Sequence, residues 1–310
     1  MGIRWRTLRP QDLQVRPRRN HRLLAGVVGL CTLLAGPWAT AQAPSKASAN
    51  PLDVPPRSWA VDVVQNELAA LHHPNSYLRY RMHIVDAKGD RVRDVIESKD
   101  GSVARLILKD GRPLTEDEDK DERKRLNDML ANPDEFAKHI KDDASGKKLA
   151  DQLMRLMPDA MIYSYTPGQP QTGKNGGNLE VVIDYKPNPK FSPPITAAEA
   201  LTGLEGRVWV DAKSHHLVRM EGTVFRAVNF GWGMLAHIYP GGHLSIEQTD
   251  AGNNRWIFTK FKEDIKIRAL MLKTVHIQSE VEAGSFQTLP GPMSYEEAIR
   301  VLLNTPLPSK

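Results

Sequence analysis

The sequence has almost no cysteine. Its 310 residues contain one, Cys31, which lies inside an apolar run near the N-terminus. Leu30 precedes it, whereas a lipoprotein signal carries a small residue at that place, so we do not expect lipidation. If this segment is removed on export, the remaining chain has no thiol. It can then form no disulfide and use no cysteine nucleophile.

The N-terminal segment has the order of a secretory signal. A basic region containing Arg18 and Arg19 precedes the apolar run 23–35, and Ala39-Thr40-Ala41 supplies the small residues of a cleavage site. The apolar run is too short to span a membrane. We therefore expect cleavage after residue 41, location in the periplasm and no integral membrane segment in the mature chain. Residues 42–56, rich in Ala, Ser and Pro, are predicted to be a flexible leader.

The excess of positive charge is confined to this signal. Residues 1–41 carry seven Arg and one Asp, whereas the whole chain has a net charge of +5. The mature chain is therefore close to neutral. Its charge gives no indication of a nucleic-acid partner.

The motifs of common catalytic and metal sites are also lacking. The segment 168–174 resembles a phosphate loop but has no final Ser or Thr, and the glycines after it open a strand rather than a helix. The acidic repeat 117–121 resembles the start of a calcium loop, but Glu122 stands where glycine is needed. No H-E-x-x-H and no G-x-S-x-G occurs. We expect a protein that is not an enzyme, with no catalytic residue, cofactor or metal.

Two pairs of histidines stand near predicted turns. His215 and His216 follow Asp211-Ala-Lys-Ser, whose small polar residues are typical of a hairpin turn. We expect both side chains to be largely solvated there. His237 and His243 flank a second predicted turn, 239–242, where a metal site between them is the less favoured alternative.

The first part of the mature chain predicts one helix and three strands. Apolar residues at helical spacing indicate a helix from Ser58 to Leu71. The strict alternation of residues 77–84 is typical of a strand. Turn residues at 88–90 and at 100–101 then separate the predicted strands 91–98 and 103–109. Short turns favour an antiparallel meander.

A helical block interrupts the strands. Thr115 and Glu118 have the spacing of a capping box, which marks a helix start. Helical character continues over 115–157, with breaks expected near Pro133 and Gly146. These residues are predicted to form a helical insertion.

The rest of the chain to residue 287 is predicted to be strands with one apolar and one polar face. The fold class is therefore α+β, with a large curved antiparallel β-sheet whose apolar face the helices cover. Residues 57–287 are expected to form one domain that includes the insertion. No element is assigned to the C-terminal tail 288–310, which is rich in Pro near its start.

One hairpin resembles a known family. Gly206-Arg-Val-Trp-Val-Asp-Ala-Lys-Ser and Leu217-Val-Arg-Met-Glu are similar to a hairpin of the LolA/LolB-like superfamily of bacterial lipoprotein carriers. The element order over residues 58–285 resembles that superfamily as well. The resemblance implies an incomplete barrel wrapped over a few helices, with an apolar cavity that takes acyl chains. This chain would be a distant and enlarged member.

The resemblance and the strand alternation together give a functional hypothesis. We expect an exported carrier of a lipid, an acylated ligand or a lipoprotein, bound between sheet and helices. The candidate lining residues are Leu78, Tyr80, Met82, Ile84, Val218 and Met220. One alternative is a structural or sensing protein of the cell envelope with a filled core, which acts through protein partners. A hydrolase is a less favoured alternative.

Overall fold

The computed structural model describes residues 50–72, 76–173, 177–231, 234–269 and 272–309. The predicted signal, its cleavage site and most of the leader lie outside these ranges. Within them, no helix has the length and apolar character needed to cross a membrane.

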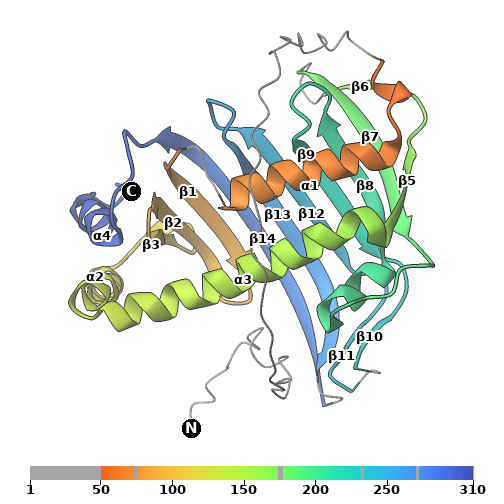
Figure 1. The fold of residues 1–310 in the computed structure, drawn as a ribbon. Coiled ribbons are helices and arrows are strands. Elements are labelled where there is room, and N and C mark those ends of the chain that lie inside the picture. Colours follow the sequence, from red (N-terminus) through yellow and green to blue (C-terminus); the bar gives the residue numbers. More distant parts are fainter. Residues whose placement is uncertain (1–49, 73–75, 174–176, 232–233, 270–271, 310) are drawn as a thin grey trace, which may run out of the picture.

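A single antiparallel sheet of 14 strands dominates the fold, as the sequence predicted (Figure 1). Its main path runs β4-β3-β2-β1-β14-β13-β12-β9-β8-β7-β5 and does not close into a barrel. The strands are β1 Leu78–Asp86, β2 Gly89–Ser98, β3 Gly101–Lys109, β4 Arg112–Pro113, β5 Met161–Tyr165, β6 Gln171–Thr172, β7 Leu179–Pro187, β8 Leu204–Asp211, β9 Leu217–Val224, β10 Val228–Phe230, β11 Ala236–Ile238, β12 His243–Asp250, β13 Trp256–Ala269 and β14 Lys273–Thr288.

The predicted meander of β1, β2 and β3 is confirmed. Its first strand, β1, also pairs with β14, the last strand of the chain. The meander therefore extends one side of the sheet that the later strands form. This long-range pairing joins the two ends of the described chain into one structure.

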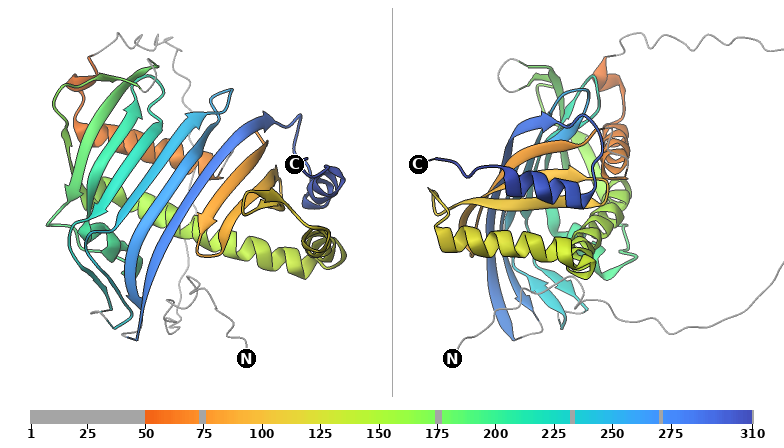
Figure 2. Two further views of the ribbon diagram at one scale, coloured as in Figure 1. Left: turned by 180° about the vertical axis from the view of Figure 1, so that it is seen from behind. Right: turned by 90° about the vertical axis from the view of Figure 1, so that its left-hand side faces the viewer.

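Two long helices lie side by side across one face of the sheet (Figures 1 and 2). They are α1, Pro56–His72, and α3, Pro133–Ala160. We call the face that they cover the inner face and the opposite one the outer face. The short 3₁₀ helices Pro51–Asp53 and Thr196–Gly203 complete this layer.

The helical block differs from its prediction at one point. The capping box of Thr115 and Glu118 is present at the start of α2, Glu116–Ala131, and Asn132-Pro133 separates α2 from α3. The break expected at Gly146 was wrong, because α3 runs through it. A single exposed glycine costs a helix only about 1 kcal/mol relative to alanine, which a long helix packed along its length tolerates.

The C-terminal tail contains a helix that the sequence analysis missed. Helix α4, Tyr295–Asn304, starts with a capping box of Ser294 and Glu297. Its Ala298, Ile299 and Leu302 are fully buried on the outer face of β2 and β3, together with residues of α2 and α3. The tail is thus part of a core that lies apart from the one beneath α1.

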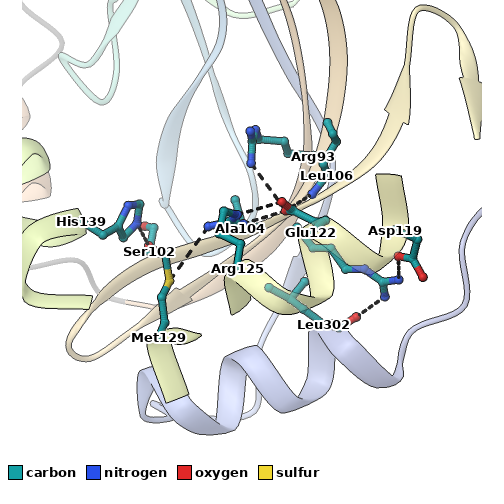
Figure 3. A network of polar contacts seen from close by, with 11 residues as sticks. Arg93, Ser102, Ala104, Leu106, Asp119, Glu122, Arg125, Met129, His139 and Leu302 are labelled. Atoms are coloured by element: carbon teal, nitrogen blue, oxygen red, sulfur yellow. Dashed lines mark hydrogen bonds and ion pairs between the residues drawn. The ribbon is translucent and has the colours of Figure 1, made fainter. Parts of the chain in front are cut away.

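Side chains from α2 and α3 occupy the edge of β3 that β4 leaves open (Figure 3). Glu122 accepts the N–H of Leu106 at 2.7 Å, and Arg125 donates to the carbonyl of Ala104 at 2.6 Å. His139 lies 3.0 Å from the carbonyl of Ser102. An unpaired strand edge is a template for another chain, and here helix side chains satisfy it.

Candidate ligand-binding face

An apolar row crosses the inner face of the sheet. Directly opposed residues of antiparallel strands place their side chains on the same face. Following the pairing from β5 to β1, the opposed residues are Tyr165, Ile183, Val208, Met220, Ile246, Phe261, Val281 and Ile84. The alternation seen in each separate strand therefore combines into a continuous apolar row.

The cover over this row is uneven. Near β7, Trp59 and Val63 of α1 pack against it, and Ile183 is only 1% exposed. Farther along, Ile246, Phe261, Val281 and Ile84 are only half-buried. The helices thus complete a core around Ile183, against which the half-buried Tyr165, Val208, Met220 and Ile246 still pack. Phe261, Val281 and Ile84 continue the row beyond this core and are partly open to solvent.

Tyr185 fills the inner face at the well-covered side. It stands opposite Gly206, and its hydroxyl donates to the carbonyl of Glu221 at 3.0 Å. A Cβ at Gly206 would lie 2.7 Å from that hydroxyl and 1.9 Å from the same carbonyl. Glycine at this position lets the ring cross to the neighbouring strand. Burial raises the pKa of Tyr185 well above its usual range, so the hydroxyl stays neutral.

Two carboxyl groups interrupt the apolar character of the inner face. Glu263 stands opposite Leu244 and Ser279, and burial raises its pKa. Glu67 of α1 accepts from the Gln248 amide at 2.8 Å, and burial raises its pKa too. The sequence analysis missed both groups. The position of Glu263 on the inner face could have been predicted from the sequence, because it alternates in phase with the apolar residues of its strand.

The predicted lining residues of β1 lie together. Leu78 and Tyr80 are buried in an apolar cluster with Val95, and Met82 packs against it. The rings of Tyr80 and Phe286 are 5.7 Å apart. This cluster consists of strand and turn residues. Leu78 and Tyr80 are therefore core residues, whereas Ile84, farther along β1, belongs to the half-buried part of the apolar row.

The two predicted residues of β9 lie beside a bulge in that strand. Met220 lies in the apolar row and packs against two core clusters. Val218 lies at a β-bulge, because the pairing with β8 shifts so that Leu217 faces Val210 and Arg219 faces Trp209. Leu217 packs into the core. Val218 is half-buried, and its place in the lining stays a prediction.

His215 and His216 end a hairpin turn, as predicted, but they are not largely solvated. His215 Nδ1 lies 2.7 Å from Asp62 of α1, and its ring centroid is 4.4 Å from that of Trp59. His216 is 8% exposed and stacks on Trp256 at 5.0 Å. Helix α1 lies over the turn, which no local pattern could indicate. Burial lowers the pKa of His216 and keeps it neutral.

The other histidine pair forms separate contacts. His237 lies 2.7 Å from Asn229, and His243 lies 3.1 Å from Thr223. Over the part of the chain that the structure describes, no group of His, Cys, Asp or Glu side chains is arranged to hold a metal ion.

A polar hollow of about 750 Å³ is found at strands β9, β12, β13, β14 and the end of β1. Many of its charges are paired with one another. Lys262 lies 2.6 Å from Glu280, and Asp264 accepts from Gln278 at 3.0 Å and pairs with His276. These hydrogen bonds, from Gln278 first and His276 second, lower the pKa of Asp264. Such internal pairing leaves little unmet charge for a ligand.

Comparison with known proteins assigns no family. No protein-family model matches the chain, and no curated protein matches it significantly. Among solved structures, the crystal structure of MucB in complex with MucA(peri) aligns with 74% of this chain and 94% of that chain, at 8% identity and a TM-score of 0.22. A similarity this low carries no functional argument.

Proposed function

We propose that this protein is an exported carrier that binds an apolar chain, such as the acyl chain of a lipid or lipoprotein, on its inner face. The observation that supports the proposal is the half-buried state of Ile246, Phe261, Val281 and Ile84. These residues continue a row in which Ile183 is buried, while Tyr165, Val208 and Met220 are half-buried and pack against the core beneath α1. A contiguous apolar surface that is left open to solvent is typical of a binding site.

The energetics favour an apolar occupant over water. Burying apolar surface contributes about 25 cal/mol per Å², so a chain laid along several half-buried side chains gains several kcal/mol. Glu263 stands two residues from Phe261 along β13, on the same face. Burial favours its protonated form. In that form it would donate a hydrogen bond to an oxygen of the ligand's polar head.

The first test is mass spectrometry of an organic extract of natively purified protein. We expect a lipid or acylated molecule in stoichiometric amount. Titration with a fluorescent fatty acid then measures binding directly. If the extract holds no such molecule and neither fatty acid, phospholipid nor acylated peptide binds saturably, the proposal fails. A protein that co-purifies in their absence would favour the partner-mediated alternative.

A pair of variants locates the site. Val281→Gln places an amide in the half-buried row and should weaken binding at least tenfold. Val85→Gln makes the same change on the outer face, at a side chain that is 42% exposed, and should leave binding unchanged. If the two variants bind the ligand equally well, the proposed site does not lie on the inner face.

A further inference from the structure

Two arginines of β2 continue the apolar row of the inner face. Ile84, the last apolar residue of the row, stands directly opposite Arg91. Arg93 follows two residues later, opposite Met82, so both arginine side chains leave the strand on the inner face. Both are only half-buried. The partly open apolar surface of Val281 and Ile84 therefore ends at two cations.

Arg93 is incompletely paired. Among the described residues, its guanidinium group makes no hydrogen bond, and its one ion pair is with Glu122 at 3.8 Å. That carboxylate already accepts from Arg125 at 2.7 and 2.8 Å and from the N–H of Leu106 (Figure 3). Burial lowers the pKa of Arg93, the Glu122 carboxylate opposes this effect, and the charges of Arg125 and Arg91 lower the pKa further. A second anion beside Arg93 would relieve this repulsion.

The other members of the cluster do not supply that anion. Arg91 pairs with Asp86, but its buried Nε has no hydrogen-bond partner among the described residues. The cluster thus contains three guanidinium groups and two carboxylates, those of Arg91, Arg93, Arg125, Asp86 and Glu122. One positive charge is left over, and Arg93 has the weakest pairing of the three cations.

Helix α3 leaves this part of the inner face open. The helix runs from the edge of β3, where His139 contacts the Ser102 carbonyl, to the start of β5 (Figure 1). Between these points, none of the side chains described over residues 141–150 is buried. A helix that packed on the sheet here would bury one of its faces. An apolar chain can therefore lie along the row and bring its head to the arginines.

We propose that Arg93, with Arg91 beside it, binds the acidic head group of the acyl ligand, a carboxylate or a phosphate. The inference rests on the proposed carriage and names its ligand class, a lipid with an acidic rather than a neutral head. The chain lies along Val281 and Ile84, and guanidinium N–H groups donate to the acid. Hydrogen bonds between two charged groups are stronger than those between neutral groups, and the planar guanidinium matches either acid.

The hydrogen bond proposed for Glu263 is compatible with this position. Glu263 stands opposite Ser279, and Ser279 stands opposite Asp86, the partner of Arg91. The two groups therefore belong to neighbouring rows of the same face. While the arginines bind the acid, the protonated Glu263 donates to a second oxygen of a larger head group.

Displacement of a fluorescent fatty acid by ligands that share one chain length tests the inference. Wild-type protein should bind oleate or oleoyl lysophosphatidate about tenfold more tightly than oleyl alcohol, because only the acids form charge-assisted hydrogen bonds. The acid that binds more tightly identifies the head as a carboxylate or a phosphate. Added salt should weaken the binding of the acids and leave that of the alcohol nearly unchanged.

Three variants locate the acid. Arg93→Gln should bind oleyl alcohol as the wild type does but lose most of the preference for the acids. Asp86→Asn removes the competing carboxylate from Arg91 and should strengthen that preference, while its amide oxygen can still accept from the N–H of Lys88. Arg81→Gln is the matched control, because Arg81 is exposed on the outer face of β1. Its preference should equal that of the wild type.

The outcomes separate this inference from the proposed carriage. If wild-type protein binds oleyl alcohol as tightly as both acids, the inference is overturned and the carriage stands. The same holds if Arg93→Gln keeps the full preference for the acids, or if Asp86→Asn does not strengthen it. If none of the three ligands binds, both the inference and the carriage are overturned.

Discussion

Glu122 of α2 accepts the backbone N–H of Leu106 at 2.7 Å, so a carboxylate occupies the edge of β3 where a further strand would otherwise pair. Only 8% of Glu122 is exposed, and Arg125 donates to the same carboxylate while also reaching the Ala104 carbonyl. Arg93 lies 3.8 Å from it. One buried carboxylate therefore connects a strand edge, a helix and two cations.

Glu122→Ala should destabilise the protein by about 3 kcal/mol. The change leaves a backbone donor and two guanidinium groups without their acceptor, and an unsatisfied buried donor costs about 1–3 kcal/mol, more when charged groups are involved. It also frees the edge of β3, so the variant should self-associate. Urea unfolding measures the first effect and light scattering the second.

Asp121→Ala is the control, because Asp121 is exposed on the same helix. It should change the free energy of unfolding by no more than about 0.5 kcal/mol. If the two variants unfold alike, the carboxylate of Glu122 does not hold the edge.

Sequence periodicity predicted the elements that repeat a local pattern. The strand at 77–84 and the box of Thr115 and Glu118 both carry their signal within a few residues, and both are present in the structure. The box of Ser294 and Glu297 carries the same local signal, so the start of α4 was predictable from the sequence.

What the sequence could not supply is the register between strands. The bulge at Val218, for example, depends on the pairing of β8 with β9. The burial of His216 depends on the ring of Trp256, which is far away in sequence. Likewise, alternation indicated an apolar face but not where α1 and α3 stop covering it. The position of the half-buried row is a tertiary property.

Glu67→Gln should make the protein more stable at neutral pH. Burial raises the pKa of Glu67, so the folded state binds this proton more tightly than the unfolded state. The resulting stabilisation is complete below the ordinary value of 4.5 and is lost as pH rises through the raised pKa. Glutamine stays neutral, and its amide can donate to the Gln248 oxygen, which has no hydrogen-bond partner among the described residues. We expect a gain of about 1 kcal/mol, the usual net value of a hydrogen bond.

Urea unfolding of wild type and variant at about pH 4 and about pH 7.5 provides the measurement. The gain from Glu67→Gln should shrink or vanish at the lower pH. A gain of the same size at both would show that the ionisation of Glu67 is not its cause.

His216→Phe should reduce the loss of stability in acid. Burial lowers the pKa of His216, so its contribution is present above the ordinary value of 6.5 and is lost as pH falls through the lowered pKa. Phenylalanine keeps the stacking on Trp256 and removes a buried nitrogen, Nδ1, that has no partner among the described residues. Thermal melts at about pH 5 and about pH 8 measure the two melting temperatures. The melting temperature of the variant should rise relative to that of the wild type as pH falls. A constant difference between the two proteins would contradict the burial of this ring.

Helix α4 should prove essential to the second core, on the outer face of β2 and β3. Leu302 is fully buried there, and its carbonyl accepts from Arg105 at 2.6 Å. Leu302→Ala removes a packed side chain and leaves a cavity, so the free energy of unfolding should fall by about 3 kcal/mol. Val301→Ala shortens the neighbouring residue, which is 39% exposed, and should cost no more than about 0.5 kcal/mol. If Leu302→Ala unfolds at the same urea concentration as Val301→Ala, the side chain of Leu302 does not hold α4 in this core.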